Sequence, residues 1–218
     1  MAIAYASSTT SAVMTSGTMT MSYTCTAGTK LLVMGLATET TTLRIGGAPT
    51  YNSVAMAQVQ TAIVGSAECT AEMWYLANPS TASAYNVIVP NTGSGLTRMV
   101  VSNYTSTEPV YLNLSTSNNV SMVNPTLQLG GVPNQSMVVD ILGDGRLSAA
   151  SANTGGTVIL TVDEGVWNDA AQYKITTADG TTIFTWVVAS DDVAHIMASF
   201  STAITLTSPV SRYFFMVM

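Results

Sequence analysis

Short apolar runs alternate with turn signals along the whole chain. Runs of Val, Ile, Leu and Met are broken roughly every ten to fifteen residues by Gly, Pro, Asn or Asp, for example at 46–49, 143–145 and 179–180. This spacing is typical of a β-sandwich or a barrel, and it differs from the longer alternation of βαβ units. The pattern therefore predicts an all-β fold, specifically a single antiparallel β-sandwich.

The predicted strands are short and many of them alternate between apolar and polar positions. They cover residues 18–24, 30–36, 41–45, 53–64, 68–77, 84–89, 96–103, 109–115, 135–142, 157–162, 171–177, 181–189, 196–206 and 210–217. Threonine is β-branched and favours strands, which allows a chain with many hydroxyl groups to form sheets.

Two of these segments carry specific expectations. Residues 181–189 are apolar on both faces, so we expect that strand to be covered on both sides. Residues 191–200 fit either a helix capped by Ser190 or a strand. We favour the strand because the alternation continues beyond Thr202, where the helical pattern fails.

The composition is poor in charge and rich in hydroxyl groups. Hydrophobic residues make up 47% of the 218 residues, charged residues only 8%, and there are 33 Thr and 23 Ser. This hydrophobic content argues against disorder. A net charge of −6 without a basic cluster argues against a nucleic-acid partner. No apolar run approaches the ~20 residues of a membrane-spanning helix, so we expect no membrane partner.

The chain shows no internal repeat of fixed period and no linker. We therefore assign one sandwich domain, residues 18–218, preceded by an extended N-terminal arm, residues 1–17. Cys25 and Cys69 each lie in a predicted strand, where buried thiols are the favoured interpretation. One disulfide between them remains open.

Candidate catalytic and metal-binding groups are sparse. His195 is the only histidine, it lies near Asp191 and Asp192, and no Gly-x-Ser-x-Gly turn accompanies it, so we interpret it as a surface or turn residue. The carboxylates of 140–145 and 163–169 fit tight turns better than a calcium loop. Glu68 and Glu72 lie roughly 13 Å apart on one strand at ~3.3 Å per residue, too far for a glycosidase pair. We expect no enzyme activity, no metal and no cofactor.

Aromatic residues offer the only candidate ligand contacts. Trp74 and Trp186 lie in apolar surroundings and are assigned to the core. Trp167 lies in an acidic turn region and is the best exposed candidate. Together with Tyr104 and Tyr111, it forms the set of possible glycan contacts.

The low charge itself suggests an assembly. Protein interfaces are depleted in Lys, Glu and Asp and enriched in Met, and the chain has 13 Met. We therefore expect its neutral surface to contact other protein. The alternative is a monomer with a neutral hydroxyl-rich surface.

Four segments resemble the jelly-roll β-sandwich domains of bacteriophage virion proteins, including head decoration and fibre proteins. They are Gly-Thr-Lys-Leu-Leu-Val-Met-Gly-Leu (28–36), Thr-Leu-Arg-Ile-Gly-Gly-Ala-Pro-Thr (42–50), Ala-Glu-Met-Trp-Tyr-Leu-Ala-Asn-Pro (71–79) and Tyr-Asn-Val-Ile-Val (85–89). The resemblance covers under a third of the chain. It implies a jelly-roll scaffold and a virion setting, and it carries over no functional residues.

These observations lead to an expected function. We expect a capsid decoration, or cement, protein on the virion surface, forming a homotrimer and bridging neighbouring copies of the major capsid protein. The alternatives are a glycan-binding fibre or adhesin module and another tail or shell structural protein.

Overall fold

The computed structural model shows only β-structure in the part of the chain that it describes. The described residues are 3–40, 46–63, 69–90, 95–122, 124–144, 151–163, 168–188 and 191–202. They form seventeen strands, and every strand pair is antiparallel. The same residues contain no helix of the length and apolar character needed to cross a bilayer. The predicted all-β, antiparallel fold class is confirmed.

The strands form four sheets, whereas the predicted single sandwich has two. The inner N-terminal sheet consists, in spatial order, of β1 (Ala4–Thr10), β9 (Thr97–Thr105), β3 (Thr29–Thr38), β7 (Thr70–Ala77) and β6 (Ala57–Ile63). The outer N-terminal sheet consists of β2 (Met19–Thr24), β8 (Ala84–Val89), β4 (Thr50–Tyr51) and β5 (Val54–Ala55).

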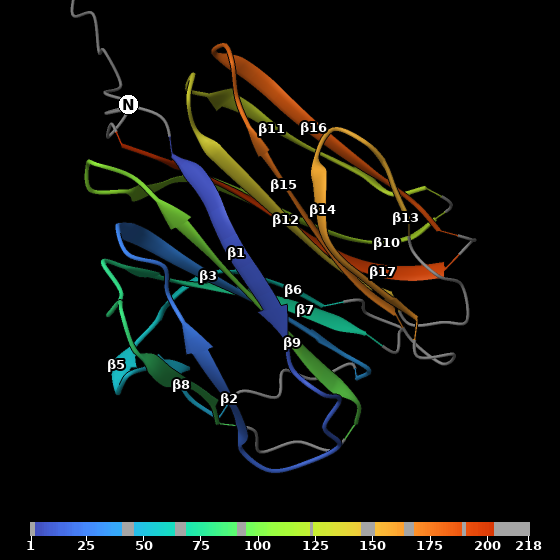
Figure 1. Ribbon diagram of the computed structural model, residues 1–218. Coiled ribbons are helices and arrows are strands. Elements are labelled where there is room, and N and C mark those ends of the chain that lie inside the picture. The colour runs from blue at the N-terminus through green and yellow to red at the C-terminus, as the bar shows by residue number, and fades with distance from the viewer. Residues whose placement is uncertain are drawn as a thin grey trace, which may run out of the picture.

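The second half of the chain forms the other two sheets. The inner C-terminal sheet consists of β10 (Tyr111–Met122), β17 (Asp191–Ser201), β12 (Met137–Asp144), β15 (Asn168–Ile175) and β14 (Thr157–Asp163). The outer C-terminal sheet consists of β11 (Thr126–Val132), β16 (Gly180–Val187) and β13 (Ser151–Thr154). The four sheets lie as successive layers, from the outer N-terminal sheet at the bottom of Figure 1 to the outer C-terminal sheet at the top right.

Apolar side chains fill each space between neighbouring layers. The central cluster joins the two inner sheets and so connects both halves of the chain. Its buried members include Leu31, Val33, Tyr104, Val139, Ile196 and Phe200. A second cluster lies between the two N-terminal sheets, and two smaller ones lie between the two C-terminal sheets. An inner strand such as β3 is therefore buried on both faces, which explains its nearly continuous apolar sequence.

The two halves of the chain repeat one topology. The order β1-β9-β3-β7-β6 corresponds strand by strand to β10-β17-β12-β15-β14, and β2-β8-β4 corresponds to β11-β16-β13. The pairing register follows the same scheme, because Val33 pairs with Tyr75 in the first half and Val139 pairs with Tyr173 in the second. Residues with the same place in this scheme are called equivalent below.

The four edge strands of the inner sheets share one irregularity. In β1, β6, β10 and β14 the register shifts after the second paired residue, and the extra residues are Ala6, Val59, Asn113 and Ile159. Such a β-bulge disrupts the hydrogen-bond ladder and twists an edge strand, which hinders pairing with a further strand. Both halves therefore carry, at equivalent places, a bulge that protects each edge of the inner sheet against pairing with a further strand.

Residues 3–17 do not extend away from the sheets as the expected N-terminal arm would. Residues 4–10 form β1 and pair with β9, and Met14 forms a bridge with Thr97. Ile3 is completely buried in the central cluster. The side chain of Ile3 and the backbone groups of β1 thus attach the segment to the protein itself.

Most predicted strands lie where β-strands form. The strand interpretation of 191–200 is confirmed, while β1, β4, β11 and β13 were not predicted, and the predicted strands 41–45 and 210–217 lie outside the described residues. The expectation for residues 181–189 was wrong. Phe184 and Trp186 are buried, but Ile183 and Val187 on the opposite face are 45% and 40% exposed, because β16 lies in an outer sheet.

Candidate functional site

The structure describes two of the three predicted glycan contacts, Tyr104 and Tyr111, and only Tyr111 lies at the surface. Tyr104 is completely buried, so its prediction as a surface contact was wrong. Its hydroxyl group is hydrogen-bonded to Ser102 at 2.9 Å, and its ring lies edge-on to Tyr5 and Tyr173. Tyr111 is 42% exposed at the start of β10. Trp167 lies outside the described residues.

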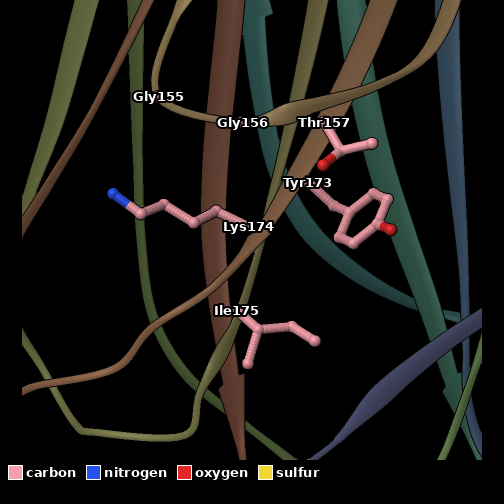
Figure 2. Close-up of a pocket in the computed structure, with 6 residues that line it drawn as sticks. All are labelled: Gly155, Gly156, Thr157, Tyr173, Lys174 and Ile175. Atoms are coloured by element: carbon pink, nitrogen blue, oxygen red, sulfur yellow. The ribbon is translucent and has the colours of Figure 1, made fainter.

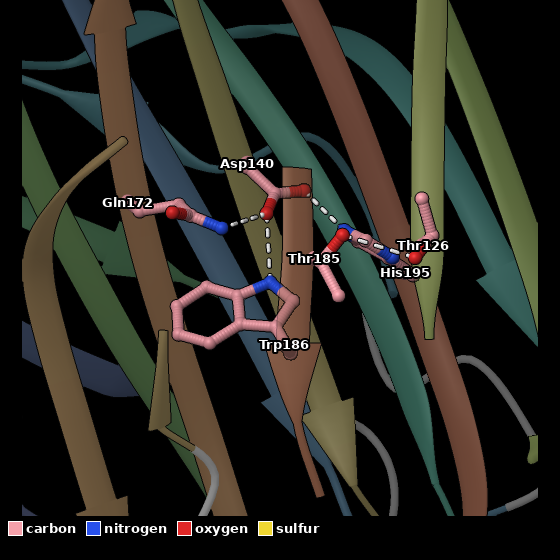
Figure 3. Close-up of polar contacts among 6 residues, drawn as sticks. All are labelled: Thr126, Asp140, Gln172, Thr185, Trp186 and His195. Carbon is pink, nitrogen blue, oxygen red and sulfur yellow. Dashed lines mark hydrogen bonds and ion pairs between the residues drawn. The ribbon is translucent and has the colours of Figure 1, made fainter. Parts of the chain in front are cut away.

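A buried polar network lies between the inner and outer C-terminal sheets. Its centre is the carboxylate of Asp140 on β12 (Figure 3). Oδ2 accepts hydrogen bonds from Gln172 Nε2 at 2.9 Å and from Trp186 Nε1 at 2.7 Å. Oδ1 is hydrogen-bonded to Nε2 of His195. All four side chains are at most 1% exposed, so the network joins three strands of the inner sheet to β16 of the outer sheet.

The network corrects the interpretation of His195. This residue was expected at the surface or in a turn, near Asp191 and Asp192, but it lies inside β17 and bonds Asp140, 55 residues away in the sequence. Burial of a charged group is costly unless hydrogen bonds satisfy it. The three bonds to Asp140 therefore make this carboxylate tolerable in the interior.

Two atoms of the network remain without a hydrogen-bond partner. They are Nδ1 of His195 and Oε1 of Gln172. An unpartnered buried polar atom costs about 1–3 kcal/mol. The network therefore contains two more buried polar atoms than its hydrogen bonds satisfy.

The N-terminal half shows that the fold does not require this polar network. The residues equivalent to Asp140, Gln172 and His195 are Met34, Trp74 and Met99. All three are buried together in the apolar cluster between the N-terminal sheets. The polar residues are therefore a property of the C-terminal half and not of the shared topology.

A surface hollow opens next to this network. It measures about 490 Å³ and lies where the turn between β13 and β14 crosses β15 (Figure 2). Its lining residues are Gly155, Gly156, Thr157, Tyr173, Lys174 and Ile175. Gly155 has φ of +114°, and a Cβ on it would lie 2.3 Å from the carbonyl oxygen of Ile183, so this turn requires glycine.

The acidic segments form no metal site within the described residues. The register brings together two predicted acidic turn segments, because Asp144 and Asp163 both pair with Asn168. No group of three metal-binding side chains is found among the residues that the structure describes. Glu72 is buried, and it accepts a hydrogen bond from Trp74 at 3.1 Å. Glu68 lies outside the described residues.

The thiols and several tyrosines are structural groups. Cys25 and Cys69 are buried thiols that are not joined by a disulfide, which confirms the favoured interpretation. Burial raises the pKa of the Cys25 thiol, while a hydrogen bond with Tyr51 opposes this effect. Burial also raises the pKa of Tyr23 to about 12 and that of Tyr104 further. Raised pKa values keep these groups protonated and unreactive near neutral pH.

Comparison of the chain with protein-family models, with curated proteins and with solved structures gave no match.

Proposed function

We propose that the protein is a structural component of a bacteriophage virion, a decoration protein that binds the capsid surface and bridges neighbouring copies of the major capsid protein. In this proposal the chain acts as a homotrimer. Its role is mechanical, because it adds contact area between subunits that are already assembled.

The observation that carries this proposal is the absence of charge from both outer sheets. None of the seven outer strands contains Asp, Glu, Lys or Arg, whereas all charged residues in the described strands belong to the inner sheets. The exposed side chains there are mainly Thr, Ser, Asn, Ile and Val. An uncharged face loses little hydration when protein covers it, and interface cores are depleted in charge in the same way.

The strand order supports a jelly-roll fold, which is the fold that this proposal assumes. In each half the first strand lies beside the last one in the inner sheet, and the second strand lies beside the last but one in the outer sheet. Eight equivalent strands in two facing sheets are the arrangement of a jelly roll. We therefore interpret the chain as two jelly rolls that share the central cluster.

A charge placed on one outer sheet tests the contact surface. Ile183 on β16 and Val158 on β14 are both 45% exposed, but only Ile183 belongs to an outer sheet. Sedimentation analysis should show a trimer for the unmodified chain and for Val158→Lys, and dissociation for Ile183→Lys. A monomer in all three samples would contradict the proposed self-assembly.

The virion role needs a separate measurement. Phage particles purified from cells that produce the protein should contain this chain. Electron microscopy should locate hundreds of copies of the chain on the outer surface of the capsid shell. A handful of copies would favour a tail or fibre protein, and particles without the chain would exclude the virion role.

A further inference from the structure

β2 (Met19–Thr24) differs from the other edge strands of the four sheets. Within the part of the chain that the structure describes, the sheets have eight edge strands. Six of them shift in register against their neighbour, namely β1, β6, β10, β11, β13 and β14. A seventh, β5, has only two residues. β2 has six residues and pairs with β8 without any shift, so it is the one long and regular edge.

β2 also lacks the residues that commonly protect an edge. Its sequence, Met-Thr-Met-Ser-Tyr-Thr, contains no charged residue and no proline. One margin of the strand pairs with β8, and no described strand lies along the other margin (Figure 1). A regular, uncharged edge is a template for a further strand, because its backbone N–H and C=O groups can bond one. Since every other edge is interrupted or very short, the exception indicates that a partner strand belongs at β2.

The side chains of β2 define what this partner strand must carry. Met19, Met21 and Tyr23 point into the apolar cluster between the two N-terminal sheets, and the alternate residues are exposed. Met19 and Tyr23 are buried, whereas Met21 in the middle of the strand is only partly buried. An added strand should therefore place apolar side chains beside Met21 on the inner face and hydroxyl groups on the outer face.

A second copy of β2 meets these requirements. In an antiparallel pair with a two-fold axis at Met21, Met21 lies opposite Met21 of the second copy, and Met19 lies opposite Tyr23. On the outer face, Thr20 then lies opposite Ser22. A shift by one residue would place apolar side chains opposite hydroxyl groups, so the pattern selects this register.

The distribution of charge favours the same occupant. Each copy has a net charge of −6, so two copies repel each other over most of their surface. β2 and the other three strands of its sheet contain no charged residue. The margin of this sheet is therefore a place where two copies can approach with little repulsion.

We propose that β2 pairs antiparallel with β2 of a second copy, across a two-fold axis at Met21, and joins two outer N-terminal sheets into one. The contact is closed, because each copy uses the same strand and the joined sheet ends in the short β5 on both sides. It buries less than the ~1,200 Å² of the smallest stable interfaces, so it forms where copies are held close together and not in dilute solution. It does not depend on the proposed shell role.

Disulfide cross-linking of the purified full chain at high concentration tests the contact. Residues directly opposite in an antiparallel pair have Cα atoms about 4.5–5.5 Å apart, within the reach of a disulfide. Met21→Cys should therefore form a covalent dimer under mild oxidation. Thr24→Cys is the control, because Thr24 is more exposed than Met21 but would lie about 20 Å from its copy. We expect Met21→Cys to cross-link at least about tenfold faster.

Lysine substitutions then locate the contact on the surface. Ser22→Lys in the Met21→Cys chain places a charge beside the axis in each copy and should slow cross-linking about tenfold. Asn86→Lys is the matched control, because Asn86 is exposed and pairs with Ser22 but lies on β8, away from the margin. Ile183→Lys, which should dissociate the proposed trimer, should also leave the cross-linking rate unchanged.

Three results would overturn the proposal. The first is equal cross-linking of Met21→Cys and Thr24→Cys, and the second is an unchanged rate with Ser22→Lys. The third is loss of cross-linking with Ile183→Lys, which would assign the covalent dimer to the proposed trimer contact. The unmodified chain measures any contribution of the two native thiols, and coincident unfolding curves establish that each variant is folded.

Discussion

Gly35 and Ile141 occupy equivalent positions in the two halves and face each other across the central cluster. A Cβ placed on Gly35 would lie 2.6 Å from Cδ1 of Ile141. The two inner sheets therefore meet with a residue without a side chain in one half and a large residue in the other. The inner sheets of the two halves can pack closely at this point because the side chains at these equivalent positions are complementary in size.

We predict a strong coupling between these two residues. Gly35→Ala should destabilise the protein by about 1–3 kcal/mol, because the added methyl group displaces the side chain of Ile141. In an Ile141→Ala background the same change should cost much less. Chemical denaturation of the four members of this double-mutant cycle measures the coupling. Additive effects of the two changes would contradict the close contact.

A second prediction concerns the carboxylate at the centre of the buried network. Asp140→Leu should destabilise the protein by about 3–5 kcal/mol, because it leaves the N–H donors of three buried side chains without an acceptor. Met34→Leu at the equivalent position is the matched control, and it should cost less than about 1.5 kcal/mol. Equal effects in chemical denaturation would show that the network contributes no more than packing.

A third prediction follows from the raised pKa of the buried tyrosines. Burial raises the pKa of Tyr23 from its ordinary value of 10.0 to about 12, so the folded state keeps a proton that the unfolded chain releases. The stabilising contribution is complete below pH 10 and is lost as the pH rises through 12. Denaturation midpoints should thus be constant up to about pH 10 and fall above it. Tyr104→Phe should reduce this decline, and a constant midpoint up to about pH 12 would contradict it.

A fourth prediction concerns the N-terminal segment. Removal of residues 1–10 should lower the free energy of unfolding, because it deletes β1 and the buried Ile3 and leaves the edge of β9 unpaired. Ile3→Ala alone should cost about 2–5 kcal/mol. Thermal unfolding of both variants measures the loss. A truncated chain as stable as the full one would restore the interpretation of this segment as a free arm.

The all-β class was predictable from the sequence because most strands carry their own apolar pattern. The strands that were not predicted lack such an apolar pattern. β1 consists mainly of small residues and hydroxyl residues, β4 has two residues, β13 has four, and β11 includes the turn signal Gly130-Gly131. Their stability comes from pairing with neighbouring strands, which a local pattern does not reveal.

The repeated topology was hidden for a different reason. Ala4 and its equivalent Tyr111 are 107 residues apart, whereas Tyr104 and its equivalent Phe200 are 96 apart, because the connections differ in length. A repeat without a fixed period gives no signal in a periodic comparison. Only the pairing register reveals it.

The candidate site was also beyond the reach of local motifs. Asp140 and His195 are 55 residues apart, and neither has a neighbour that indicates their contact. Tyr104 lies between the polar residues Asn103 and Thr105, yet β9 lies inside a sheet that is covered on both faces. A cue for the polar network was present in Asp140 itself, an acidic residue inside an apolar run.

The bulges in β1, β6, β10 and β14 have a consequence for crowded copies of the molecule. Most proteins keep separate copies from polymerising into cross-β fibrils partly by electrostatic repulsion, and a chain with 8% charged residues has little of it. The interrupted ladders at these margins supply a geometric barrier in its place. Copies at high local concentration are therefore hindered from joining edge to edge into an endlessly growing sheet.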